Sequence, residues 1–410
     1  MADLDSVTGN DIATDVSTGP ATDDNASTEL PSNPIEDVIA LFQDNLSLQD
    51  NLPPSLLLDL GLKQADDGDT GGQQQPVVTE YLCSKVPIFA RLRELRMKGW
   101  KNPKGDDYFE RQRYISDNAD GNTTTIFMKM MRAVGRKAQE ATGVFTLPGK
   151  RPNILALGFA PGGKIETAMD INKNTQVSGI TLGVEDNGIK VLVRKDLRNR
   201  MKLSYADLTM MITDLGFPMS DVPADHPDTT KFRTRLIRPR AHFDLATCEG
   251  GVLRTHARAE YRESREAHRL RAAQLALALE RVKPGGSMLV LLHHAESFRN
   301  ICLFHNFSKF AKVTLFKPDV QHQHRSSFYM IAMEIQSQSE EAANMVRQWK
   351  REWHAATFGS DEVYDEAVRS GTPDVDAVLA EFGEHFVEMA SPVWAMQVEG
   401  LGKKSFTQEE

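Results

Sequence analysis

Three glycines and a proline lie together where an apolar run ends and a helical pattern begins. Residues 157–163 read Leu-Gly-Phe-Ala-Pro-Gly-Gly, so Gly158, Gly162 and Gly163 let the backbone turn tightly and leave its amides open to a ligand. The spacing is neither the dinucleotide-binding G-x-G-x-x-G nor a phosphate loop ending in Gly-Lys-Ser/Thr. Pro161 has no N–H, which disfavours a pyrophosphate cradle of consecutive amides. The pattern predicts a different nucleotide-like ligand, and a plain strand-to-helix turn is the alternative.

Three polar side chains mark the ends of other apolar runs. Glu249 ends one run, His294 follows the next, and Ser327 begins the last. In a doubly wound sheet all three would meet at the carboxyl edge, where such sheets bind ligands. A neutral imidazole is a competent general base near pH 7, so His294 is a candidate base and Glu249 a candidate for holding the reacting geometry. The alternative for His294 is a cap of the following helix.

Seven short β-rich runs, most of them separated by helical patterns, lie between residues 153 and 335. This alternation predicts an α/β protein with a doubly wound, Rossmann-like sheet. The last two runs are joined by a short loop, which predicts an antiparallel pair at one edge. The runs cover residues 153–159, 177–182, 201–205, 243–249, 287–293, 312–316 and 326–335.

The glycine run and four later groups of motifs resemble, in order, those of the FtsJ-like RNA ribose 2′-O-methyltransferases, and most closely the fungal members. The later motifs are VSGITLGVEDNG with LSYADLT, then FDLATCEGGVLRTHARAEYRESREAHRL, RVKPGGSMLVLLHHAESF and LFKPDVQHQHRSSFYMIA, and the resemblance spans about residues 129–335. It implies a seven-stranded methyltransferase fold with S-adenosyl-L-methionine as cofactor and RNA as substrate. The cofactor-binding residues that it implies are Gly158, Ala160, Pro161, Gly162, Gly163, Thr181, Leu182, Asp207, Leu208 and Glu249.

The resemblance also implies a catalytic set. Family members use Lys-Asp-Lys-Glu, and these positions fall here on Lys129, Glu249, His294 and Ser327. The first lysine is kept and the other three residue types are changed, so the tetrad is degenerate. Asp207 would accept from the adenine amine, and it is equally a candidate N-cap of the helix that follows.

The chain divides by composition into four predicted parts. Residues 1–80 carry 16 acidic residues and one basic residue, Lys63, whereas the whole chain of 410 residues has a net charge of −9. The body is therefore mildly basic. We predict an acidic, largely disordered arm over 1–76 with a possible short helix at 35–62, a helical preface over 77–147, the methyltransferase domain over 148–337 and a helical extension over 338–410. The 35–62 helix either packs on the body or docks a protein partner.

Composition also limits the compartment and the kind of site. No run of about 18 apolar residues exists, so no membrane-spanning helix is expected. The residues Cys83, Cys248 and Cys302 are too few and too scattered for a disulfide framework or a paired-cysteine zinc motif. The first residues lack the features of a signal or transit peptide, so we expect a cytoplasmic or nuclear protein. Four histidines could gather at the carboxyl edge, but adjacent strand residues face opposite sides and no metal site is predicted; they are His293, His294, His322 and His324.

Two arginine-rich segments are candidates for contacts with RNA phosphates. One precedes the fourth strand and contains Lys231, Arg233, Arg235, Arg238 and Arg240. The other repeats arginine at three- and four-residue spacing, which places these side chains on one face of a predicted helix. A solvated helix with local pairs to Glu263 and Glu266 is the alternative. The repeated residues are Arg254, Arg258, Arg262, Arg265 and Arg269.

Three functions are compatible with these features. The leading one is an S-adenosylmethionine-dependent O-methyltransferase that acts on RNA ribose. The second keeps the cofactor but methylates a small hydroxylated metabolite. The third is a cofactor-binding pseudoenzyme that serves as an interaction module, because the tetrad is altered.

Overall fold

The fold is built around one seven-stranded sheet. The computed structural model describes residues 74–105, 107–108, 121–252, 256–319 and 323–408. The strand order is β3-β2-β1-β4-β5-β7-β6, with β7 antiparallel to both of its neighbours and the other pairs parallel. The predicted α/β class and the antiparallel last strand are confirmed. The strands are β1 Asn153–Leu157, β2 Gln176–Thr181, β3 Met201–Tyr205, β4 Phe243–Cys248, β5 Val282–His293, β6 Lys312–Phe316 and β7 Ser327–Ile335.

The central strands are buried on both faces, which explains why they read as continuous apolar runs. Successive residues of β1 alternate between two cores: Leu155 and Leu157 face one, whereas Ile154 and Ala156 face the other. In β7, Phe328 belongs to the first core. Tyr329 belongs to the second core. This alternation later decides which of its side chains can reach the candidate site.

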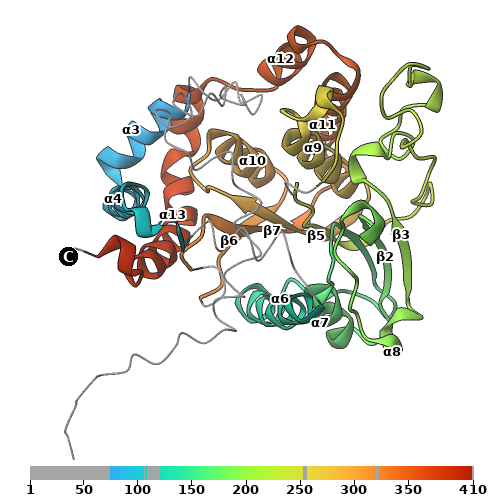
Figure 1. Cartoon of the computed structure of the whole chain (residues 1–410), viewed down its shortest axis with the longest axis horizontal. Coiled ribbons are helices and arrows are strands. Elements are labelled where there is room, and N and C mark those ends of the chain that lie inside the picture. Colours follow the sequence, from blue (N-terminus) through green and yellow to red (C-terminus); the bar gives the residue numbers. More distant parts are fainter. Residues whose placement is uncertain (1–73, 106, 109–120, 253–255, 320–322, 409–410) are drawn as a thin grey trace, which may run out of the picture.

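Helices cover both faces of the sheet (Figure 1). Helices α6 and α7 lie on one face and pack against each other, while α9, α10 and α11 lie on the other. The short α8 follows at the β3 edge. Their bounds are α6 Gly121–Thr142, α7 Gly163–Ile171, α8 Lys195–Arg198, α9 Glu266–Leu279, α10 Phe298–Ser308 and α11 Glu340–Phe358.

Segments from the two ends of the described chain pack together beside β6. Helices α3 (Gln75–Lys85) and α4 (Pro87–Lys101) contact α13 (Val375–Gly402) near its middle and end, after α12 (Asp361–Ser370). The Phe89 and Trp394 rings lie 5.1 Å apart. A Cβ on Gly383 would lie 2.5 Å from the Tyr81 hydroxyl oxygen, so α3 can approach α13 this closely only at a glycine.

The predicted helical preface thus splits in the structure. Helix α6 joins the helical layer of the sheet, whereas α3 and α4 join the C-terminal helices. The predicted arm lies outside the described residues up to position 73, including the possible helix at 35–62. None of the described helices combines the length and apolar character needed to cross a bilayer.

Candidate active site

The glycine run forms the turn between β1 and α7 at the carboxyl edge of the sheet. Gly158 and Gly162 have φ angles of +63° and +107°, which residues other than glycine rarely adopt. A Cβ on Gly158 would lie 2.2 Å from the Cα of Gly250, because the chain after β1 touches the chain after β4 at this point. A Cβ on Gly163 would lie 2.5 Å from the Met128 carbonyl oxygen of α6. Packing therefore requires small residues here independently of any ligand.

Glu249 directly follows β4 and lies beside this turn. Its amide donates to the Leu157 carbonyl over 2.9 Å, which fixes the two strand ends side by side. Gln274 of α9 bonds both backbone groups of the next residue, Gly250, at 2.8 and 3.0 Å. The Glu249 side chain is thereby held at the carboxyl edge between β1 and β4.

A buried cation approaches Glu249 from α7. The Nζ atom of Lys164 lies 2.6 Å from Glu249 Oε2, and the two side chains are 2% and 8% exposed. Lys164 Nζ also lies 3.1 Å from the Tyr329 hydroxyl of β7 and 2.8 Å from the Met131 sulfur of α6. Four elements thus converge on one ammonium group, and we call Lys164, Glu249 and Tyr329 the lysine–glutamate–tyrosine cluster.

The charge states of this cluster follow from its contacts. Burial alone would lower the pKa of Lys164, but the Glu249 carboxylate and Tyr329 outweigh it and the pKa is raised. Burial raises the pKa of Tyr329, and Glu249 adds to this effect while Lys164 opposes it. Near pH 7 the lysine is therefore charged and the phenol neutral. The second carboxylate oxygen, Glu249 Oε1, is buried and has no hydrogen-bond partner in the described structure.

The structure does not bring the other resemblance-based residues into this cluster. Lys129, assigned by the resemblance to the first lysine of the catalytic set, is exposed on α6 and forms no ion pair among the described residues. The lysine beside Glu249 is Lys164. Ser327 is fully buried at the start of β7, and its carbonyl accepts from Lys317 Nζ over 2.7 Å. It pairs in register with His293, at the end of β5.

His294 belongs to a different network. Its Nδ1 lies 3.3 Å from Glu296 Oε1, and Glu296 in turn binds Arg96 of α4 at 2.5 Å and Trp394 of α13 at 3.3 Å. Burial would raise the pKa of Glu296, but Arg96 and His294 outweigh it and hold the pKa well below its usual range. Ser297 is the N-cap residue of α10, so the alternative of a capping histidine at position 294 is wrong.

The positions that the resemblance assigns to the adenosine half of the cofactor lie at the ends of β2 and β3. Thr181 is the last residue of β2 and is buried, and Leu182 follows it. Asp207 accepts from the Thr209 amide and caps the short helix Leu208–Met210, which confirms its predicted N-cap role. Burial would raise the pKa of Asp207, but Arg262, at 3.1 Å, and Thr209 outweigh it and the pKa is lowered.

The arginine face predicted after β4 is wrong. Helix α9 begins only at Glu266, and Arg262, Arg265 and Arg269 are buried under α11 and α12. Arg262 pairs with Asp207, Asp228 and Glu266, and Arg269 pairs with Glu266. These guanidinium groups are structural, and Arg254 lies outside the described residues. The earlier segment is exposed throughout, at Lys231, Arg233, Arg235, Arg238 and Arg240.

Among the described residues no group of three or more histidine, cysteine or acidic side chains is close enough to hold a metal ion. His322, one of the four histidines considered from the sequence, lies outside them.

Comparison with known proteins now adds to this geometry. The sequence model of the FtsJ-like methyltransferase family matches residues 135–335, from the middle of α6 to the end of β7. Residues 135–335 are an FtsJ-like methyltransferase domain. The recognised family is therefore confirmed over this part of the chain, which is a methyltransferase that uses S-adenosylmethionine. The comparison with curated proteins gave no match.

Solved structures resemble the FtsJ-like domain only distantly. A ribosomal RNA methyltransferase from Plasmodium falciparum is 14% identical, with 49% of this chain and 96% of that chain covered and a TM-score of 0.30. An rRNA methylase from Streptococcus thermophilus is 10% identical, with 47% and 92% covered and a TM-score of 0.28. An O-methyltransferase family protein from Burkholderia thailandensis is 12% identical, with 74% and 94% covered and a TM-score of 0.30.

The residues of the FtsJ-like domain fit its cofactor. The first amides of a helix lack partners within the helix, and no side chain caps α7 at Gly162, so an anionic group such as the methionine carboxylate is suited to this end. The orphaned Glu249 Oε1 is suited to a cation or to a hydrogen-bond donor. Both features lie where β1 and β4 end, which is the ligand edge of this class of sheet.

Sequence reasoning missed Lys164 and Tyr329, although one signal was present. Lys164 is the second residue of α7, where the positive end of the helix dipole disfavours a cation. A buried lysine at such a position needs a carboxylate partner, and Glu249 supplies it. Tyr329 gives no comparable signal, because only the pairing of β5 with β7 places its ring on the α7 side of the sheet.

Proposed function

We propose that the FtsJ-like domain transfers the methyl group of S-adenosylmethionine to a ribose 2′-hydroxyl of RNA. The observation that carries the proposal is the lysine–glutamate–tyrosine cluster beside the β1–α7 glycine turn. When bound, the cofactor supplies an electrophilic methyl group on a sulfonium. What the protein must add is a group that orients the attacking hydroxyl and takes its proton.

Glu249 is suited to both tasks. Lys164 holds Oε2 at 2.6 Å, so the carboxylate is fixed in one orientation and Oε1 stays open to accept from a substrate hydroxyl. As the new C–O bond forms, the hydroxyl proton becomes strongly acidic, and a carboxylate is then basic enough to accept it. Lys164 stays protonated because its pKa is raised, and its positive charge balances Glu249 before the transfer. Tyr329 fixes the ammonium position from β7.

The exposed basic segment before β4 supports a polyanionic substrate. Its side chains can each contact a phosphate, and Arg233 and Arg238 form no ion pair among the described residues. A small metabolite would need no such surface. Asp207 and Thr181, at the ends of neighbouring strands, are the proposed contacts for the adenosine half of the cofactor.

Tritiated methyl transfer to cellular RNA fractions tests the substrate. We expect label in RNA, resistance of the labelled linkage to alkaline hydrolysis, and a steep fall of RNA affinity with salt concentration. Glu249→Gln should abolish labelling, whereas Glu94→Gln, an exposed surface change, should not. Label on bases, or labelling only of small hydroxylated metabolites, would contradict the proposal.

A further inference from the structure

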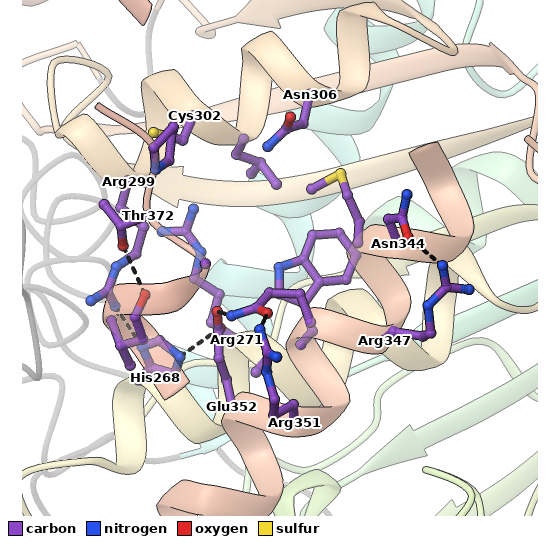
Figure 2. A pocket seen from close by; sticks show the side chains of 18 of the residues that line it. His268, Arg271, Arg299, Cys302, Asn306, Asn344, Arg347, Arg351, Glu352 and Thr372 are labelled. Atoms are coloured by element: carbon purple, nitrogen blue, oxygen red, sulfur yellow. Dashed lines mark hydrogen bonds and ion pairs between the residues drawn. The ribbon is translucent and has the colours of Figure 1, made fainter. Parts of the chain in front are cut away.

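A cavity of about 700 Å³ lies on the face of the sheet opposite α6 and α7 (Figure 2). Helices α9, α10 and α11 line it, together with Val368 of α12 and residues 371–373 between α12 and α13. Helix α7, which the glycine turn begins, packs on the other face of the sheet, and α11 lies beyond the part of the chain that the FtsJ-like family model matches. Methyl transfer therefore gives this cavity no role. Its size is that of a small-molecule site.

Cationic side chains outnumber acidic ones in the cavity lining, with Arg271, Arg299, Lys309, Arg347 and Arg351 against Glu341 and Glu352. Arg347 and Arg351 lie one turn apart on α11 and donate only to the neutral amides of Asn344 and Gln348. Lys309, at the end of α10, forms no salt bridge within the described part of the chain. Like charges one turn apart destabilise a helix, so this arrangement favours binding of an anion between them.

Glu352, on the inner wall of the cavity, forms no ion pair with Arg347 or Arg351 among the described residues. Arg299 Nη1 lies 2.8 Å from His268 Nδ1, and His268 Nε2 lies 2.9 Å from Glu352 Oε2. Arginine can only donate, so Nδ1 accepts and the imidazole is neutral with its proton on Nε2. Burial and the charge of Arg299 lower the pKa of His268 accordingly. Burial would raise the pKa of Glu352, but its contacts with His268 and with Gln348, at 2.6 Å, outweigh it and the pKa is lowered, so the carboxylate is charged. The five cationic side chains of the lining still outnumber its two carboxylates.

Apolar and aromatic side chains form part of the remaining lining, beside polar groups such as Asn306 and Thr372. Phe298, Leu303, Met345 and Trp349 contribute to it. A ligand that satisfies both surfaces combines a phosphate group with a flat apolar ring. We propose that this cavity is a second ligand site, which binds a nucleoside phosphate with its phosphates at Arg347, Arg351 and Lys309 and its base against the apolar floor. The proposal is independent of the substrate of methyl transfer.

Calorimetric titration with ADP tests the site on the full-length protein. S-adenosylhomocysteine is added first at saturation, so that ADP cannot occupy the adenosine region of the cofactor site. We expect ADP to bind to the unmodified protein. The double variant Arg347→Glu/Arg351→Glu should lower ADP affinity at least tenfold and leave S-adenosylhomocysteine affinity unchanged. Both side chains are exposed, so folding should be preserved. The matched control is Arg136→Glu/Arg151→Glu, which reverses two exposed arginines away from the cavity, one of them on α6 on the other face of the sheet, and should leave ADP affinity intact.

Adenosine and inorganic pyrophosphate test the base contacts and the phosphate contacts of the cavity separately. Each should bind more weakly than ADP, because each satisfies only one surface of the cavity. An equal loss of ADP affinity in the two double variants would overturn the site. So would the absence of ADP binding to the unmodified protein saturated with S-adenosylhomocysteine. Pyrophosphate binding as tight as that of ADP would overturn the assignment of a nucleoside.

Discussion

Lys164 Nζ and Glu249 Oε2 lie 2.6 Å apart, although Lys164 is in the first turn of α7 and Glu249 follows β4. The contact joins the glycine turn of β1 to the neighbouring strand end, so it fixes the geometry of the carboxyl edge. It also places a cation in the first turn of a helix, against the helix dipole. The ion pair therefore serves the candidate chemistry at some cost in local helix stability.

Breaking this pair from the lysine side should destabilise the protein strongly. Lys164→Met leaves the Glu249 carboxylate without its partner, and we expect the free energy of unfolding to fall by about 3–5 kcal/mol. Lys164→Met/Glu249→Gln should lose less, because no uncompensated charge stays buried. Urea unfolding of the two variants measures the difference. A double variant less stable than the single one would show that the pair is not coupled in this way.

Gly162 should be required both for the turn and for the cofactor. A Cβ at this position would lie 2.5 Å from Val193 Cγ2, and the φ angle of +107° adds strain of about 1–2 kcal/mol for an L side chain. Gly162→Val should weaken S-adenosylmethionine binding more than tenfold, which is over 1.4 kcal/mol. The double variant Gly162→Ala/Val193→Ala removes most of the steric conflict with Val193 but keeps the strained φ angle, so it separates the two effects. Calorimetric affinity equal to that of the unmodified protein in a folded Gly162→Val variant would refute the role in cofactor binding.

Several features of the fold follow from the sequence because they depend on local pattern. Strands buried on both faces read as apolar runs, and the short loop between β6 and β7 identifies the antiparallel pair. The arginine repeat shows where local pattern misleads. Its spacing is that of a helix face, but the partners of Arg265 and Arg269 include Asp361 and Thr357, about 90 residues later in the chain. Only the packing of α11 and α12 shows that these side chains are buried.

Part of the candidate site could also be predicted from local sequence pattern, and part could not. Glu249 ends an apolar run, and any sheet of this class brings it to the ligand edge. Lys164 was missed because the resemblance directs attention to a lysine on the preceding helix, Lys129. The connection of His294 to Arg96 and Trp394 depends on helices α4 and α13, which lie outside the family match and carry no motif.

The network around Glu296 should make stability depend on pH in the acidic range. The pKa of Glu296 in the folded protein is lowered, so its contribution is complete above the unfolded-state pKa of about 4.3 and is lost as the pH falls below it. Glu296→Gln should cost about 3 kcal/mol at pH 7 by leaving Arg96 without its carboxylate partner. The difference from the unmodified protein should shrink below pH 4 in denaturant titrations. A constant difference across this range would show that the carboxylate charge is not responsible.

The final prediction separates the two candidate proton acceptors. The sequence predicts His294 as the base, whereas the geometry favours Glu249. The His294 side chain contacts Glu296. In addition, His293, the last residue of β5, is three positions past Val290, which pairs with Cys248. At about 3.3 Å per strand residue, His293 lies roughly 10 Å farther along the sheet than Cys248, the last residue of β4, and His294 lies beyond it.

We expect Glu249→Gln to lower kcat by about two to four orders of magnitude, the usual contribution of a positioned base, with little change in cofactor affinity. His294→Ala should lower kcat less than tenfold and should mainly reduce stability, because it removes one partner of Glu296. Single-turnover methyl transfer at several pH values measures both effects. The reverse pattern, with the full loss in His294→Ala and little loss in Glu249→Gln, would assign the proton to the imidazole and leave Glu249 as the group that orients the substrate.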